Sequence, residues 1–194
     1  MVHTEETYTT ERNGFITTGD ISTRTGYLQV LKAAKRGDLI RVRHGVYARP
    51  QALFNTMIDI ERIVPGGVVC LYNAWAFYQL STTVPPHICV AIETDRKVVL
   101  SKKVDIKLYY WKKENLDFGI VEQAVSGFEV RMTDIERSVC DAIKYRNKVG
   151  IDVCAEVVRN YLQRRDRDIS KLMEYSQRLR TSATLKKYLE IALV

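Results

Sequence analysis

The apolar positions between residues 15 and 37 recur at helical spacing, which predicts two short helices joined by a turn. We expect Thr18 to cap the first helix, with Asp20 in its first turn, because a threonine side chain accepts a hydrogen bond from a free amide at a helix start. The turn falls at residues 25 and 26, where a glycine follows a threonine. Two helices joined in this way predict a helix-turn-helix.

The second helix is expected from about residue 27 to residue 36, with its end at Gly37. Leu28, Leu31 and Ala34 fall on one side of it and are expected to face inward. The outward side then carries long polar or aromatic side chains, namely Tyr27, Lys32, Lys35 and Arg36. A helix that enters the major groove of DNA needs side chains of these types on a rigid face.

Residues 39 to 48 alternate between apolar and polar positions, which predicts a β-hairpin with Gly45 at its turn. Arg41 and Arg43 are expected on the same side of the first strand, and His44 stands at the tip. A helix-turn-helix followed by a basic hairpin is typical of a winged helix, in which the hairpin, called the wing, approaches the phosphate backbone. Winged helices also serve as protein-binding modules, and this function remains an alternative to DNA binding.

The remaining chain mixes strands with helices. After a helix-like segment at residues 53–64, we expect a buried aromatic helix at 68–80, strands at 87–94, 104–111, 118–125 and 128–133, and helices at 135–149, 152–165, 168–179 and 183–193. Thr133 to Glu136 is expected to form a capping box. The order predicts an α+β protein with an N-terminal winged helix-turn-helix in residues 1–50 and, in residues 51–194, an α+β domain with a small, mostly antiparallel sheet and several C-terminal helices.

The net charge of +7 on 194 residues is concentrated in short stretches. Residues 24–49 hold seven basic residues and one acidic residue, which favours a polyanionic partner such as nucleic acid over a merely solvated surface. The longest run without Lys, Arg, Asp or Glu, 63–92, is broken by prolines and glycines and does not predict a membrane-spanning helix. Since the N-terminus has no apolar signal core, we expect a cytoplasmic protein that does not act at a membrane.

The four cysteines and three histidines are scattered along the chain and show no metal-ligand spacing. We expect the cysteines to be small buried hydrophobic residues. The chain has neither a phosphate-binding Gly-rich loop nor the Gly-x-Ser-x-Gly pattern of a nucleophilic hydrolase. We therefore expect no metal, no cofactor and no enzymatic activity.

Three alternatives remain open. Glu93 or Asp95, followed by Asp105 and Lys107, loosely imitates the acidic and basic groups with which restriction-type nucleases hold a metal ion. An aromatic set formed by Tyr72, Trp75, Phe77 and Tyr78 lines either a ligand pocket or, as we favour, the core. A third set, the C-terminal arginines, forms a solvated face or a second DNA-facing surface and comprises Arg159, Arg164, Arg165, Arg167, Arg178 and Arg180.

Two motifs carry a resemblance to a known family. The first runs through the predicted hairpin as Gly37, Leu39, Arg41, Val42, Gly45, Val46 and Tyr47. The second opens the helix at 135–149 as Thr133, Asp134, Glu136, Arg137 and Asp141. In this order, and over nearly the whole chain, the sequence resembles the AbiEi family of antitoxins from bacterial type IV toxin–antitoxin systems, which act in abortive infection as a phage defence.

The resemblance implies a transcriptional repressor whose winged helix binds inverted repeats of double-stranded DNA in its own promoter, with two copies pairing on the DNA. It also implies that the chain counters a toxin resembling a nucleotidyltransferase, without a stable complex between the two. The DNA-contacting residues that it implies are Thr25, Tyr27, Lys32, Lys35, Arg36, Arg41, Arg43 and His44. For the second motif we favour a helix cap and an internal ion pair between Arg137 and Asp141 over a catalytic role.

Overall fold

The computed structural model describes residues 11–53, 59–125 and 127–192. The chain forms two compact units. Unit 1 comprises Met1–Pro65 and Lys97–Asp105, and unit 2 comprises Gly66–Arg96 and Ile106–Val194. The boundary therefore falls at residue 65 rather than at 50, and a short segment from the middle of the sequence belongs to the N-terminal unit. Both units combine helices with a sheet, which confirms the α+β class.

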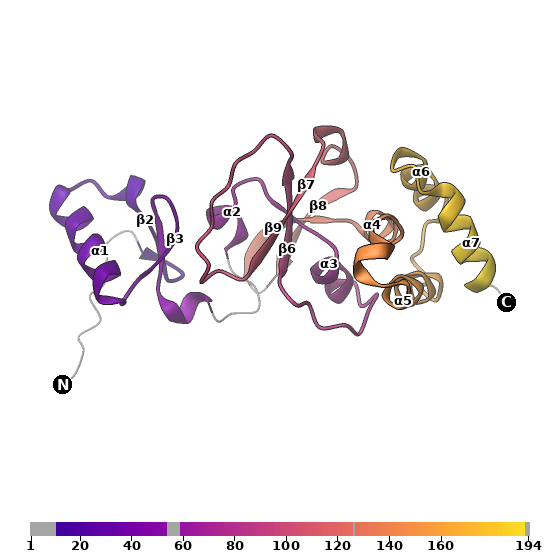
Figure 1. Ribbon diagram of the computed structural model, residues 1–194, viewed down its shortest axis with the longest axis horizontal. Coiled ribbons are helices and arrows are strands. Elements are labelled where there is room, and N and C mark those ends of the chain that lie inside the picture. The colour runs from indigo at the N-terminus through magenta and orange to yellow at the C-terminus, as the bar shows by residue number, and fades with distance from the viewer. Residues whose placement is uncertain (1–10, 54–58, 126, 193–194) are drawn as a thin grey trace. The chain divides into compact units, whose positions relative to one another are not determined.

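Unit 1 contains a four-stranded sheet and one longer helix (Figure 1). Its strands are antiparallel throughout, in the order β1-β2-β4-β3, with β1 at Glu11–Arg12, β2 at Phe15–Thr17, β3 at Ile40–Arg43 and β4 at Val46–Ala48. Helix α1 spans Arg24–Arg36, and shorter helical turns are η1 at Thr18–Asp20, η2 at Pro50–Leu53 and α2 at Ile60–Ile63. Ile16, Leu39 and Tyr47 of the sheet region form a small core with Val30 and Ala33 of α1.

The prediction of a first α-helix was wrong in the part of the chain that the structure describes. Strand β2 and the short 3-10 helix η1 occupy the place of the predicted helix. Ile16 pairs with Tyr47 of β4, so the apolar spacing that suggests a helix belongs instead to a strand held by a partner distant in sequence. Part of the helix-like segment at 53–64 lies outside the described residues, and α2 is its described portion.

Helix α1 begins three residues earlier than expected and ends where expected. The side chain of Thr23 caps it by accepting a hydrogen bond from the amide of Gly26, so the predicted turn at residues 25 and 26 is the first helical turn. The helix stops at Gly37, whose amide donates to the carbonyl of Ala33. Its buried face carries Val30 and Ala33, so the prediction that Leu28 faces inward was wrong.

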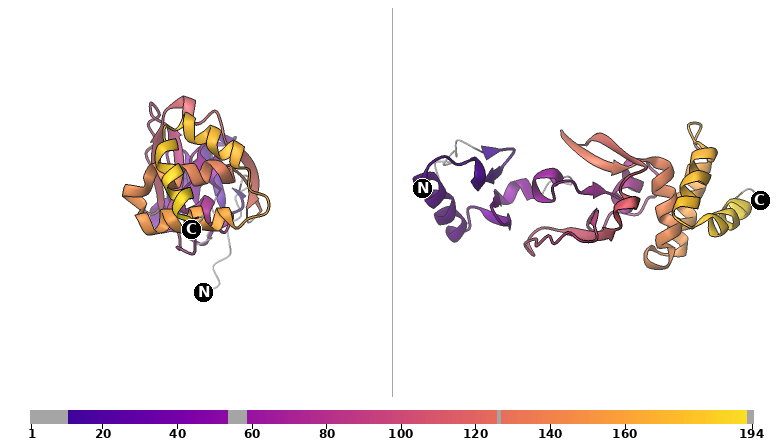
Figure 2. Two further views of the ribbon diagram at one scale, coloured as in Figure 1. Left: turned by 90° about the vertical axis from the view of Figure 1, so that its right-hand side faces the viewer. Right: turned by 90° about the horizontal axis from the view of Figure 1, so that it is seen from above.

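Unit 2 contains a five-stranded sheet in the order β7-β6-β5-β9-β8. The strands are β5 at Val68–Val69, β6 at Ile88–Glu93, β7 at Ile106–Trp111, β8 at Ile120–Val125 and β9 at Phe128–Thr133. Its helices are α3 at Tyr72–Phe77, α4 at Ile135–Val149, α5 at Ile151–Leu162, α6 at Ile169–Arg178 and α7 at Ser182–Ala192, with the 3-10 turn η3 at Lys113–Asn115. The last four helices gather on one side of the sheet (Figure 2).

This sheet is mixed, which corrects the prediction of a mostly antiparallel one. Strand pairs β6–β7 and β5–β9 are parallel, whereas β5–β6 and β8–β9 are antiparallel. The long segment between β6 and β7 allows the chain to return in the same direction, which a tight hairpin does not. The predicted helix at 68–80 is likewise divided, because Val68 and Val69 form the central strand β5 and only Tyr72–Phe77 is helical.

The core of unit 2 lies between the sheet and the helices. Trp75 of α3 is fully buried and donates from Nε1 to the carbonyl of Ser138 of α4 at 2.9 Å, which joins two helices distant in sequence. The four cysteines are free thiols and all are buried, as expected. Burial raises the pKa of the Cys140 thiol, so it is a neutral packing group at physiological pH.

Candidate nucleic-acid interface

The outer face of α1 carries most of the residues expected to contact DNA. Lys32, Lys35 and Arg36 are exposed, and so is Thr25 in the first turn. Tyr27 is also exposed, at 43% of its surface. Arg36 forms an ion pair of 2.8 Å with Asp38, the first residue after the glycine that ends the helix.

Leu28 adds an apolar group to this face. It has 46% of its surface exposed, follows the exposed Tyr27 in the sequence and precedes Lys32 by four residues, one helical turn. Leu28 was predicted to face inward because it falls at helical spacing with Leu31 and Ala34. The helix buries Val30 and Ala33 against the sheet instead.

The hairpin predicted as the wing, residues 39–48, is formed by β3 and β4 with His44 and Gly45 at its turn. Arg41 and His44 are exposed, as the sequence predicts. Arg43 is half-buried, and its Nε donates to the carbonyl of Arg62 in α2 at 3.0 Å. The pairing register shifts between Arg41 and Arg43, so these two arginines do not occupy equivalent positions on the strand.

Thr18 supports the turn of the wing from outside. Its amide and its hydroxyl both donate to the carbonyl of Gly45, at 2.8 and 3.2 Å. The prediction that Thr18 caps an α-helix was wrong, because β2 and η1 occupy the place of that helix. The hydrogen bonds hold the tip of the hairpin against the residue that follows β2.

A basic segment, residues 97–105, that was not predicted to belong to unit 1 lies along the edge of this sheet. Within Lys97–Asp105, the amide of Ser101 donates to the carbonyl of Val42 on the outer edge of β3 at 2.9 Å. A turn follows, in which Lys102 and Lys103 are exposed and Val104 is buried. The adjacent pair of lysines was visible in the sequence, but its place beside the wing was not.

Charge on unit 1 is positive and poorly compensated. Three of its carboxylates are already engaged with arginines, in the pairs Glu11–Arg49, Asp38–Arg36 and Asp59–Arg62. Among the described residues, no carboxylate lies within ion-pair distance of a set of exposed cations that comprises Arg24, Lys32, Lys35, Arg41, Lys102 and Lys103. Uncompensated cations of this kind produce the positive potential that attracts a polyanion.

The second sequence motif forms a buried polar cluster in unit 2. Asp134 caps α4 by accepting from the amide of Arg137 at 2.8 Å. The predicted capping box was wrong, because Thr133 bonds Ser138 and Glu136 accepts from the hydroxyl of Tyr161. The predicted ion pair between Arg137 and the carboxylate at 141 is present and fully buried.

Lys171 of α6 ties this cluster together from another element. Its Nζ lies 3.0 Å from Asp134 and 3.1 Å from Glu136. Partial burial lowers the pKa of Lys171, but the hydrogen bonds to the two carboxylates outweigh burial and hold that pKa above its ordinary value. The cluster therefore links α4 to α6, a connection that the sequence did not predict.

The acidic and basic residues of the nuclease alternative are divided between the units. Asp105 belongs to unit 1, whereas Glu93, Asp95 and Lys107 belong to unit 2. Across the described ranges, no group of three or more His, Cys, Asp or Glu side chains is placed to hold a metal ion.

Two C-terminal arginines are held by their neighbours within unit 2. Arg164 pairs with Asp166 at 2.8 Å, and the guanidinium of Arg178 lies 3.9 Å from the centre of the Phe118 ring. Among the aromatic residues considered for a pocket, Trp75 belongs to the core, whereas Tyr72 is only half-buried.

Comparison with the models of known protein families gave no match, and comparison with curated proteins gave none either. None of the helices in the described ranges has the length and apolar character needed to cross a membrane.

Proposed function

We propose that unit 1 binds double-stranded DNA through the outer face of α1 and the wing, and that the chain is a sequence-specific transcriptional autorepressor. The observation that carries the proposal is the set of exposed cations on α1 and β3 that have no carboxylate partner among the described residues. Cations on a rigid helix and a hairpin suit phosphates that flank a groove.

The dimensions of α1 support the same proposal. Its thirteen residues correspond to a helix about 20 Å long, which is enough to lie in the major groove. Lys32 and Lys35 are three residues apart and therefore lie on one side of the helix. Val30 and Ala33 fix the opposite side against the sheet, so the exposed side chains project from a rigid support.

The antitoxin part of the proposal rests on the two sequence motifs. We infer from them that the chain represses its own operon at inverted repeats, binding as a pair, and counters a toxin that resembles a nucleotidyltransferase without a stable complex. Co-expression with such a toxin encoded beside the chain should restore growth if this part is correct. A strain that stays inhibited while the chain is produced in excess would contradict it.

A second candidate function has its own observation. Tyr27 and Leu28 expose 43% and 46% of their surfaces on the same helix as the lysines. Aromatic residues such as tyrosine are enriched in protein-binding surfaces. The alternative is therefore that unit 1 is a protein-interaction module that uses α1.

The experiment that tests DNA binding is fluorescence anisotropy with the DNA upstream of the chain's own gene and with a scrambled duplex, across a salt series. The native duplex should bind much more tightly, and the affinity should fall steeply with salt. The variant Lys32→Ala, Lys35→Ala, Arg41→Ala should bind roughly tenfold or more weakly. Its salt slope should decrease by about 0.9 for each phosphate that the variant no longer neutralises.

The matched control removes exposed cations elsewhere. Lys186→Ala, Lys187→Ala changes two exposed lysines of α7 in unit 2 and should leave the affinity for DNA unchanged. If both duplexes bind weakly and equally, unit 1 is not a specific DNA reader and the interaction module becomes the better explanation. Tyr27→Ala, Leu28→Ala would then be the variant that abolishes partner binding.

A further inference from the structure

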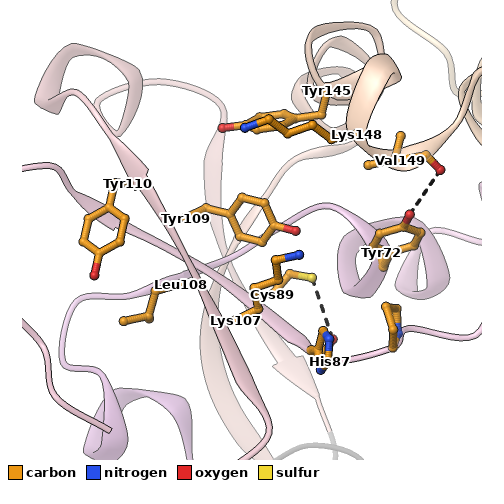
Figure 3. A pocket seen from close by; sticks show the side chains of 11 residues that line it. Tyr72, His87, Cys89, Lys107, Leu108, Tyr109, Tyr110, Tyr145, Lys148 and Val149 are labelled. Carbon is orange, nitrogen blue, oxygen red and sulfur yellow. Dashed lines mark hydrogen bonds between the residues drawn. The ribbon is translucent and has the colours of Figure 1, made fainter.

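Unit 2 contains a pocket of about 490 Å³ that none of the residues discussed for DNA binding lines (Figure 3). Its wall is built from the edge strand β7, the residues that lead into β6, the start of α3 and the last turn of α4. Pockets of this size in proteins hold ligands of the size of a nucleotide or a drug. The residues that determine its chemistry are Tyr72, His87, Lys107, Tyr109, Tyr145 and Lys148.

The middle of the pocket is aromatic. The rings of Tyr109 on β7 and Tyr145 on α4 meet edge to face with their centres 5.7 Å apart. Figure 3 shows the ring of Tyr109 at the centre, with Tyr145 and Lys148 on one side of it and His87 on the other. Flat aromatic walls favour a ligand that itself has a flat ring, because two rings pack over a large area.

The polar groups of the pocket are basic. Lys107, Lys148 and His87 all line it, and none of the residues that line it is acidic. The Nζ atoms of Lys107 and Lys148 lie 5.7 Å from the ring centres of Tyr109 and Tyr145, respectively. Among the described residues, neither lysine forms an ion pair with a carboxylate.

The charge of one of these lysines is stabilised by its position in a helix, whereas the charge of the other is not. Lys148 stands in the last turn of α4, where the helix dipole favours a cation. Lys107 lies on the strand β7, and no carboxylate of the described residues forms an ion pair with it. Lys107 and Lys148 both line the pocket, and none of its described lining residues is acidic, so the pocket favours an anion.

The tyrosine hydroxyls supply hydrogen-bond donors. Burial raises the pKa of Tyr109, so its hydroxyl keeps its proton at neutral pH. The hydroxyl of Tyr145 accepts from Trp111 Nε1 at 2.8 Å, which fixes the position of its ring. The hydroxyl of Tyr72 donates to the carbonyl of Val149 at 3.2 Å and so fixes the wall at the end of α4.

We propose that this pocket binds a small anion that carries a flat ring, of the chemical class of nucleoside monophosphates and aromatic carboxylates. The ring lies against Tyr109 and Tyr145, and the phosphate or carboxylate is held by Lys107 and Lys148, with His87 at the rim. The proposal does not depend on DNA binding by unit 1, because all of these residues belong to unit 2.

Isothermal titration calorimetry on the full chain tests the proposal. The probes are AMP, GMP, CMP and UMP for the phosphate source and 2-hydroxybenzoate for the carboxylate source, each titrated to millimolar concentration. The uncharged nucleosides and inorganic phosphate are the reference probes. At least one of the anions with a ring should bind more tightly than either the matching nucleoside or phosphate alone, and the source that binds identifies the ligand class.

The variant Lys107→Met, Lys148→Met keeps the aliphatic stems and removes the charges. It should weaken binding of that anion by about tenfold or more, since each lysine contributes a charge-assisted hydrogen bond. Lys112→Met, Lys113→Met is the matched control, because it removes the same charge from two exposed lysines outside the pocket and should leave binding unchanged. Tyr109→Phe keeps the ring and should weaken binding less than the double lysine variant.

Two results would overturn the proposal. The first is that no anion with a ring binds at millimolar concentration to wild-type protein whose circular dichroism and melting curve indicate a folded state. The second is that binding is weakened equally by the pocket variant and by the control, which would make it a general effect of surface charge.

Discussion

Arg137 and Asp141 form an ion pair of 3.1 Å in which both side chains have no exposure to solvent. The guanidinium lies over two aromatic rings, 4.7 Å from the centre of Trp111 and 4.4 Å from that of Phe118. Its Nη1 donates to the carbonyls of Asn115 and Phe118, at 2.8 and 3.1 Å. One arginine therefore connects α4 to the segment between β7 and β8, and its charge is balanced by a single carboxylate.

Loss of one partner of this pair should strongly destabilise the protein. Arg137→Met leaves the carboxylate of Asp141 buried without its cation, and we expect a decrease of about 3–5 kcal/mol in the free energy of unfolding, measured with urea. Arg137→Met combined with Asp141→Leu should cost less than the sum of the two single changes. Arg146→Met on the same helix is the control, because Arg146 is not fully buried. A loss below about 1 kcal/mol for Arg137→Met would contradict the prediction.

Gly119 lies so close to Arg137 that a larger residue has no room there. A Cβ atom at position 119 would lie 2.7 Å from Cβ of Arg137, at a backbone φ of 63°. Gly127 has a similar φ of 82°, but a Cβ there would meet no described atom within 4 Å beyond its chain neighbours. We therefore expect Gly119→Ala to destabilise the protein by about 1–3 kcal/mol more than Gly127→Ala, from thermal or urea unfolding. Equal losses would mean that backbone strain alone decides the cost.

Glu156 of α5 should make the stability of unit 2 depend on pH. Burial raises the pKa of its carboxyl, but hydrogen bonds from the hydroxyls of Ser81 and Thr82 and from the Thr82 amide, at 2.7 to 2.8 Å, outweigh burial and lower the pKa below its ordinary value of 4.5. A carboxyl with a lowered folded-state pKa contributes stability above its unfolded-state pKa and loses it as the pH falls through the folded-state value.

Glu156→Gln should consequently reduce the free energy of unfolding at neutral pH, and the difference from wild type should shrink as the pH falls below about 4.5. Urea unfolding between neutral and acidic pH measures this difference. Glu174→Gln, an exposed position on α6, should give the wild-type pH profile. A Glu156→Gln difference that stays constant over the same range would show that the hydrogen bonds do not favour the charged form.

Lys102 and Lys103 should contribute to DNA binding if the proposed function is correct. The segment that carries them is joined to the edge of β3 by the hydrogen bond from Ser101 to Val42. Lys102→Ala, Lys103→Ala should weaken binding to all duplexes alike and reduce the salt slope by about 0.9 for each phosphate left without its lysine. Anisotropy titrations measure both effects, and Lys186→Ala, Lys187→Ala serves as the control. A pair of lysines that can be removed without change in affinity or salt slope would place this segment outside the interface.

Local signals in the sequence predicted several elements of the fold correctly. Gly37 ends α1 and Gly45 lies at the turn of the wing, because glycine adopts the backbone conformations that these positions need. The strong helical periodicity of residues 135–149 predicted α4 with its bounds, and the i, i+4 spacing predicted the Arg137–Asp141 pair. In the candidate interface, Thr25, Tyr27, Lys32 and Lys35 are exposed as expected from their place on α1.

Partners distant in the sequence decided the rest. Residues 15–17 form a strand because β4 pairs with them, and Val68–Val69 lies between β6 and β9 although its sequence fits a helix equally well. Leu28 faces solvent because the sheet packs against Val30 and Ala33, and Arg43 turns to a carbonyl of α2 that no spacing rule indicates. The segment at 97–105 packs against β3, which is far from it in the sequence. The pocket of unit 2 is likewise lined by residues from distant parts of the chain. Glycine positions, caps and helical periodicity act within a few residues, so they can be predicted from the sequence. Strand pairing, the rotation of a helix and the formation of a pocket depend on which distant surface packs best, and only the tertiary structure determines that surface.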